Sequence, residues 1–110
     1  MERPVKGDVV VVPFPFSDLS LAKRRPALVL ADLDGDDVIL VQITSRAMQD
    51  RYSLPIADAD FAQGELRLPS YVRPNRIFTA DRSLILYRVG MLKPDRLAEA
   101  VTRVVSILES

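Results

Sequence analysis

The first half of the chain carries three short apolar runs rich in β-branched residues, and residues that favour turns separate them. Residues 8–12 hold four valines, residues 27–31 read ALVLA, and residues 38–44 read VILVQIT. Runs of this length that are bounded by Gly, Pro and Asp predict β-strands rather than helices. The DLDGDD sequence between the second and third runs predicts a hairpin turn. The chain is therefore expected to form a sheet of short antiparallel strands.

The hairpin turn is rich in aspartate, which raises the question of a calcium loop. Its acids are Asp32, Asp34, Asp36 and Asp37. A calcium loop needs a specific alternation of ligands and a glutamate at its twelfth place, and this sequence has neither. A solvated turn is the expected structure.

Further strands are expected downstream, at residues 52–56, 66–72 and 76–80. Pro55 lacks the N–H that a central strand needs, so the first of these segments is expected at a sheet edge. Between it and the next segment lies ADADFAQGEL, which predicts a turn or a short helical insertion. The Pro74-Asn75 pair is expected to separate the last two strands.

The C-terminal segment changes to a helical period. One face of the expected helix holds Leu97, Val101, Val104, Val105 and Leu108. Pro94 suits the first helical position, Asp95 complements the helix N-terminus, and Lys93 is the expected cap. Because this apolar face is expected to pack on the sheet, residues 1–110 are expected to form one mainly β domain. It would be a small antiparallel β-barrel or strongly bent sheet with a C-terminal helix.

Charge is balanced overall but uneven along the chain. Fifteen basic and fifteen acidic residues cancel, and twelve of the basic residues are arginine. Between Arg67 and Arg88, five arginines stand against one acid, Asp81. The planar guanidinium suits bidentate contact with phosphate, so the cluster favours a phosphate-bearing partner. Each arginine alone is equally consistent with a solvated charge on a strand face.

The sequence shows neither a secretory signal nor a membrane span. Its first residues, MERPVKGD, are charged where a signal peptide is apolar. No apolar run approaches the length that crosses a bilayer. A cytoplasmic protein is therefore expected.

Histidine and cysteine are both absent from the chain. Their absence removes serine–histidine and cysteine–histidine nucleophilic systems, histidine-based zinc sites and paired-histidine cleavage of RNA. The four glycines lie too far apart for a phosphate-binding loop. Carboxylates at Asp58 and Asp60, or at Asp18, could bind magnesium, but exposed turns explain them more simply. What remains is arginine charge with Ser and Thr hydroxyls, which suits phosphoryl-group chemistry without a metal or cofactor.

The stretch PFPFSDLSLAKRRP, residues 13–26, interrupts the strand pattern with prolines and a Lys-Arg-Arg triplet. It predicts neither strand nor helix, and it lies between two expected strands as a long excursion from the sheet. With its flanks it reads GDVVVVPFPFSDLSLAKRRPALVLA, followed by VILVQITS. This order resembles the opening of the MazF/PemK-like toxins, the ribonuclease members of bacterial and archaeal toxin–antitoxin pairs. The resemblance continues through PSYVRPNRIFTAD and LILYRVGMLKPDRL, so it covers essentially the whole chain.

The resemblance implies an SH3-like barrel of antiparallel strands with a C-terminal helix, usually assembled as a symmetric homodimer. It also implies the activity of an mRNA interferase, a metal-independent endoribonuclease that cuts single-stranded RNA at short sequence motifs. In that reaction the ribose 2′-hydroxyl attacks the adjacent phosphate and leaves a cyclic phosphate and a 5′-hydroxyl. A cognate antitoxin protein is the implied partner. The terminal helix and residues 71–77 are the expected dimer surface.

The resemblance also implies site residues. Arg25 matches the family's catalytic arginine before the proline, and Thr44 matches its catalytic threonine at the end of the third strand. Arg25 is expected to stabilise charge on the scissile phosphate, and Thr44 to donate its hydroxyl to a phosphate oxygen. Ser45 is an alternative source of that hydroxyl. The expected RNA contacts are Lys23, Arg24, Ser45, Arg46, Phe16 and Asp18.

The long loop departs from the family pattern in one respect. Many relatives carry a glutamate and a glycine ahead of the Arg-Pro pair, whereas this chain has Leu-Ala-Lys-Arg. An acid that assists proton transfer is therefore missing from the loop unless Asp18 serves. Phe14 and Phe16 offer rings for base stacking, but their spacing in a continuing strand favours a place in the core for both.

Two other functions stay open on the sequence. One is a toxin of the same fold that acts by binding a protein such as gyrase. Relatives of that kind end in a tryptophan-containing tail, whereas this chain has no tryptophan and ends in SILES. The other is a catalytically inactive RNA-binding barrel, which would keep the arginines without depending on Thr44.

Overall fold

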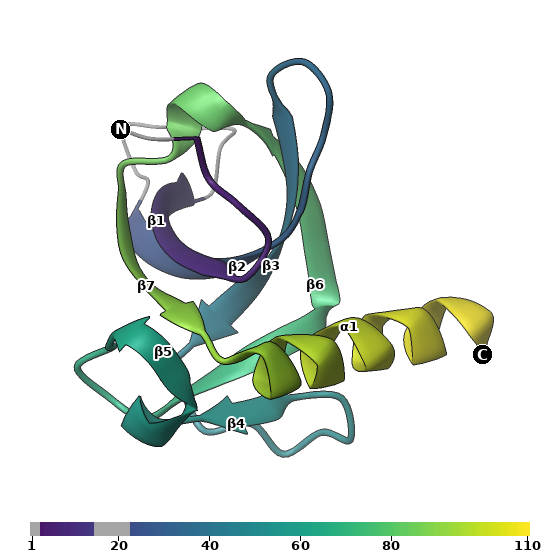
Figure 1. Cartoon of the computed structure of the whole chain (residues 1–110). Helices are drawn as coiled ribbons and strands as arrows, with labels where there is room; N and C mark the ends of the chain where they lie inside the picture. Colours follow the sequence, from purple (N-terminus) through teal and green to yellow (C-terminus); the bar gives the residue numbers. More distant parts are fainter. Residues whose placement is uncertain (1–2, 15–22) are drawn as a thin grey trace.

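Seven antiparallel strands form one sheet in the computed structural model, which describes residues 3–14 and 23–110. The elements are β1 (Asp8–Phe14), β2 (Lys23–Asp32), β3 (Asp37–Thr44), β4 (Leu54–Ile56), the 3-10 helix η1 (Asp58–Asp60), β5 (Phe61–Gly64), β6 (Ser70–Asp81), the 3-10 helix η2 (Arg82–Leu84), β7 (Tyr87–Leu92) and α1 (Pro94–Glu109). The strand order is β4-β6-β3-β2-β1-β7-β5. Figure 1 shows the sheet curled into a half-barrel, with α1 running across it beside β4 and β5. The predicted mainly β fold with a C-terminal helix is confirmed.

Both faces of the central strands are buried, which explains why their sequences are continuous apolar runs rather than alternating ones. On β2, Leu28 and Leu30 belong to a cluster that also includes Ala100 and Val104 of α1. The intervening Val29 belongs to a second cluster, formed inside the curl of the sheet by residues of β1, β2, β3 and β6 together with Ile85. A strand buried on both faces cannot slip in register without exposing apolar surface, so this arrangement fixes the sheet.

Helix α1 begins at Pro94 with Lys93 at its N-cap, as predicted. Val104 is buried and Val101 packs against the same cluster. Val105 and Leu108 are 44% and 71% exposed, so their predicted place in the core is wrong. Periodicity identifies the apolar face of a helix, but it does not show how far the underlying sheet extends beneath that face. None of the described helices is long and apolar enough to cross a membrane.

Strand β6 replaces the two separate strands that were predicted around Pro74-Asn75. The pairing with β3 passes from Gln42 opposite Arg73 to Val41 opposite Ile77. Three residues of β6, Pro74, Asn75 and Arg76, therefore bulge out where β3 advances by one step. A bulge tolerates proline because its residues do not take part in the ladder.

The hairpin of β1 and β2 is longer than predicted, so residues 13–26 are not wholly outside regular structure. Pairing continues from Val12 opposite Arg25 to Phe14 opposite Lys23. The pairing of β2 with β3 ends at Ala27. Because the tip of the hairpin has no third strand on that side, prolines near it interrupt no further ladder. The remaining part of the predicted excursion lies outside the described residues.

The short edge strands were predicted only in part. β4 lies at one edge of the sheet, as Pro55 indicated, and η1 is the predicted helical insertion. β5 was missed, and β7 was not identified as a strand. The two pair with each other at the opposite edge, through Phe61 opposite Leu92 and Gly64 opposite Gly90. A four-residue strand leaves too short a pattern in the sequence to be recognised.

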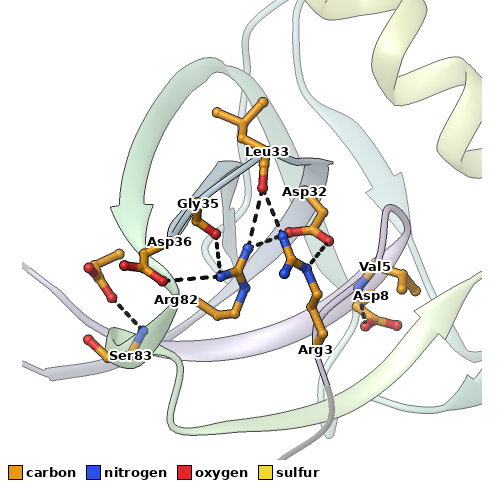
Figure 2. Close-up of polar contacts among 10 residues, drawn as sticks. Arg3, Val5, Asp8, Asp32, Leu33, Gly35, Asp36, Arg82 and Ser83 are labelled. Carbon is orange, nitrogen blue, oxygen red and sulfur yellow. Dashed lines mark hydrogen bonds and ion pairs between the residues drawn. The ribbon is translucent and has the colours of Figure 1, made fainter.

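An ion-pair network holds the closed end of the β2–β3 hairpin (Figure 2). The Asp32 carboxylate lies 2.7 Å from Arg3 Nε and 2.7 Å from Arg82 Nη2. Arg82 Nη1 also donates to the carbonyl of Gly35 at 2.8 Å. These contacts join the N-terminal segment, the hairpin turn and η2. Asp32 is exposed, as expected of a solvated turn, and it is also a structural partner of both arginines.

The backbones of β5 and β7 approach so closely where Gly64 pairs with Gly90 that only glycine fits at these two positions. A Cβ on Gly64 would lie 2.0 Å from the Val89 carbonyl oxygen, and a Cβ on Gly90 would lie 2.4 Å from that of Gln63. Gly64 also has a φ of +69°, a conformation that residues with a side chain rarely adopt. Both constraints fix the backbone at the end of β5.

Replacing Asp32 with Asn is expected to lower Tm at neutral pH. The hydrogen bond from Arg3 and then that from Arg82 hold the Asp32 pKa below its ordinary value. A depressed folded-state pKa adds stability above the unfolded-state value, and this stability is lost as pH falls. The Tm difference between wild type and Asp32→Asn should be full at pH 7 and narrow below about pH 4. Asp34→Asn, in the same turn, is the control, and an equal loss in both variants would contradict the assignment.

Replacing Gly64 with Ala is expected to destabilise the protein more than replacing Gly35 with Ala. Both glycines have positive φ, but nothing lies within 4 Å of a Cβ built on Gly35. Gly35→Ala should therefore cost only the left-handed conformation, about 1 kcal/mol. Gly64→Ala adds the clash with Val89, so urea unfolding should show a clearly larger loss. An equal loss of unfolding free energy in the two variants would show that the backbones of β5 and β7 can move apart to accept the methyl group.

Candidate nucleic-acid interface

Arg25 and Thr44 lie on neighbouring strands at the open end of the β2–β3 hairpin. The last pair between these strands is Ala27 opposite Gln42. Arg25 and Thr44 each lie two residues beyond this pair on their own strand. Side chains alternate along strands, so both residues fall on the same face of the sheet as that pair. The two candidate catalytic residues are therefore brought together by the hairpin register.

Two hollows meet at this pair. The first, called here the arginine groove, has a volume of about 570 Å³ and is lined by Arg25, Arg46, Arg73 and Arg76 among others. The second, the Tyr87 hollow, has a volume of about 540 Å³, and its walls include Tyr87, Leu66, Leu68, Glu65, Arg24 and Arg67. The residues common to both are Arg25, Ile43, Thr44 and Ser45. A strand-like ligand that passed from one hollow to the other would cross Arg25 and Thr44.

The Thr44 hydroxyl is held in place by the backbone. Its Oγ1 accepts a hydrogen bond from the Arg46 N–H at 3.1 Å, where β3 ends. This bond uses a lone pair of the oxygen, and the hydroxyl hydrogen can still be donated to a ligand. The geometry suits donation to a phosphate oxygen. Ser45 follows on the exposed side of the same turn and lines both hollows.

The arginine groove carries more positive than negative charge, and the described acid whose charge interacts with a groove arginine is Asp50, with Arg73. No Asp or Glu of the described chain lines it. Arg25, Arg46 and Arg76 form no ion pair with a described residue. The Nε of Arg73 is buried with no hydrogen-bond partner among the described residues. Uncompensated guanidinium groups that converge on a groove provide the electrostatic setting for a polyanion.

The predicted arginine cluster divides into two functional groups. Arg82 belongs to the network around Asp32, and Arg88 Nε lies 2.9 Å from the buried Asp8 carboxylate. These two side chains stabilise the fold. Arg73 and Arg76 reach the arginine groove because the bulge in β6 displaces the chain between them. Arg67 lies on the Tyr87 hollow.

The other predicted contact residues are placed unevenly. Arg24 lines the Tyr87 hollow and Arg46 the arginine groove, whereas exposed Lys23 lines neither. Phe16 and Asp18 lie outside the described residues, so the predicted core position of Phe16 is not addressed. Phe14 is half-buried, and its ring centroid lies 6.0 Å from that of Phe78, which packs against the core inside the curl.

Several residues of the two hollows were missed by the sequence reasoning. They are Gln42, Met48, Glu65, Leu66, Leu68 and Tyr87. Arg73 and Arg76 were noted only as members of the charge cluster. The proline inside β6 was the available signal, since a proline in a strand pattern marks a bulge and bulges often border functional sites. Glu65 and Tyr87 are brought to the hollow by the pairing of β5 with β7, which the sequence did not indicate.

Several solved structures have the same fold, and three of them are compared with this chain below. An endoribonuclease from Mycobacterial species superposes with a TM-score of 0.75 at 19% identity, over 99% of this chain and 94% of that one. A MazE–MazF complex from Deinococcus radiodurans gives a TM-score of 0.75 at 20% identity, over 98% and 97%. MazF from the same organism gives 0.74 at 24% identity, over the full length of both chains. At these identities the likeness establishes the fold.

The sequence itself matches a family model over residues 5–108, nearly the whole chain. That model describes the PemK-like, MazF-like toxins of type II toxin–antitoxin systems. No curated protein matches the sequence significantly. The fold and the family model agree, and the chain belongs to the family of PemK-like, MazF-like toxins of type II toxin–antitoxin systems.

Proposed function

We propose that the chain is a metal-independent, sequence-specific endoribonuclease that cuts single-stranded RNA in the cytoplasm. The observation that carries this proposal is the junction of two hollows at Arg25 and Thr44, with the Thr44 hydroxyl held by the Arg46 N–H. Among the solved structures of the same fold are proteins named as endoribonucleases. A groove lined by four arginines and no described carboxylate suits a polyanionic strand.

The proposed reaction uses the substrate's own hydroxyl as nucleophile. The 2′-hydroxyl attacks the adjacent phosphorus, the bond to the 5′-oxygen breaks, and a cyclic phosphate and a 5′-hydroxyl result. Arg25 stabilises the negative charge that develops on the phosphate oxygens, and Thr44 donates its hydroxyl to one of them. Arginine keeps its proton at pH values below about 12, so Arg25 serves as a charge stabiliser rather than as a general base.

Metal independence is supported by the chemistry of the side chains. The chain has no histidine or cysteine, and no group of three acidic side chains in the described part of the chain could hold a metal ion. The charge that a metal would neutralise in phosphoryl chemistry can be neutralised by the guanidinium groups of the arginine groove. Retained cleavage in EDTA is the direct check.

The remaining contacts are assigned to substrate binding. Arg24 and Arg46 lie on different hollows that meet at the proposed cleavage point, so they would bind phosphates on either side of it. Ser45 adds a hydroxyl at the junction. Lys23 would attract the strand from the tip of the hairpin. Phe16 and Asp18 remain proposed RNA contacts in the loop outside the described residues.

We also propose two protein partners. A symmetric homodimer would cover Val105 and Leu108 of α1 and Ile77 of β6, which are large, apolar and exposed. A cognate antitoxin is proposed because one of the similar structures is a MazE–MazF complex. A monomeric mass by light scattering at micromolar concentration would contradict the dimer. Failure of a candidate antitoxin to bind or inhibit the chain would contradict that protein's role as its partner.

The central test is cleavage of a long single-stranded RNA in EDTA, with the product ends mapped. Wild type should give fragments with cyclic phosphate ends. Arg25→Ala and Thr44→Val should each lose roughly 100-fold to 1,000-fold in rate, the usual effect of removing one group that stabilises the transition state. RNA binding should survive in Thr44→Val, because the arginines remain.

Matched control variants exist for both substitutions. Arg51 is exposed and bonds to the Tyr52 hydroxyl, away from both hollows, and Thr102 is exposed on α1. Arg51→Ala and Thr102→Val should cleave like wild type. If wild type and all variants bind RNA without cutting it, the chain is an RNA-binding barrel and not an enzyme.

A further inference from the structure

Glu65 is the only acidic residue among the described side chains that line the two hollows. It lies on the wall of the Tyr87 hollow, which Arg25 and Thr44 also line. The segment after β5 contributes Glu65 to the same hollow as Thr44, the last residue of β3. A carboxylate is thus present beside the proposed cleavage point, although the β1–β2 hairpin contributes none from its described residues.

The backbone that carries Glu65 is fixed immediately before it. Gly64 pairs with Gly90 of β7, and neither position has room for a side chain. Phe61, at the start of the same strand, is buried in the main core cluster. The strand is therefore held at both ends, and the chain leaves it in a defined direction toward the hollow.

The Glu65 side chain is exposed on the wall of the Tyr87 hollow. It forms no ion pair and no side-chain hydrogen bond with a described residue. Its neighbours on the hollow are the cations Arg24 and Arg25 of β2, Arg67 of its own segment, and Tyr87 of β7. An acid beside a bound polyanion weakens binding through like-charge repulsion, so its presence calls for a chemical function.

We propose that the Glu65 carboxylate is the general base of the cleavage reaction, an inference that rests on the proposed ribonuclease activity. The carboxylate takes the proton of the 2′-hydroxyl as the bond from the 2′-oxygen to phosphorus forms. The bond from phosphorus to the 5′-oxygen breaks, and water supplies the proton that the departing 5′-oxygen needs. The assignment provides a proton acceptor that neither Arg25 nor Thr44 can be.

The test separates catalysis from binding because Glu65→Gln should lower the cleavage rate without weakening RNA binding. Glu65→Gln should bind an RNA with a 2′-deoxy nucleotide at the cleavage position as tightly as wild type or more tightly, since a negative charge is gone. Its single-turnover cleavage of normal RNA should fall by roughly 100-fold or more, the usual contribution of a general base. Glu65→Asp should recover part of the rate, and the loss of rate at low pH in wild type should disappear in Glu65→Gln.

Two matched variants complete the experiment. Glu99→Gln, on α1 and away from both hollows, should cleave like wild type. Asp18→Asn tests the other acid that could act as the base, and its cleavage at saturating RNA should still slow at low pH as in wild type. The assignment of Glu65 is overturned if Glu65→Gln cleaves as fast as wild type. It is also overturned if the loss of rate at low pH disappears in Asp18→Asn and not in Glu65→Gln. In both cases the ribonuclease activity itself stands. If wild type does not cleave, both proposals fall together.

Discussion

The rest of the structure depends on the antiparallel pairing of β2 with β3. Both strands are buried on both faces, so a slip in register would expose an apolar row on either side. At the closed end of the hairpin, Asp32 and Arg82 hold the turn. At the open end, Arg25 and Thr44 lie two residues beyond the last pair of the same hairpin and line the same two hollows. The stability of one end and the proposed chemistry of the other are thus properties of a single hairpin.

Arginine has two different roles in this small protein, and ion pairing distinguishes them. Arg82 and Arg88 are matched with Asp32 and Asp8, and they hold distant segments of the fold together. The arginines of the groove form no close ion pair with a described residue, although Arg73 interacts at longer range with Asp50, and their charges repel one another unless an anion is bound. A polyanion would relieve this repulsion, which is why overall neutrality does not argue against an RNA ligand.

Much of the architecture could be predicted from the sequence because its information is local. The valine-rich strand β1, the aspartate-rich turn between β2 and β3, and the start of α1 at Pro94 are each marked by a short sequence pattern that has a direct physical cause. What could not be predicted depends on distant pairing. The bulge in β6 and the close pairing of Gly64 with Gly90 exist only because other strands lie opposite. The candidate site follows the same division: the resemblance indicated Arg25 and Thr44, whereas Arg73, Arg76 and Glu65 needed the fold.

The most direct measurement is a crystal structure with a short single-stranded RNA that carries a 2′-deoxy nucleotide at the cleavage position. The account predicts a phosphate at the junction of the two hollows, within hydrogen-bond distance of Thr44 Oγ1 and the Arg25 guanidinium. It also predicts the sugar of the preceding nucleotide facing Glu65. RNA bound on another surface, such as the exposed face of α1, with the junction free of phosphate, would contradict it.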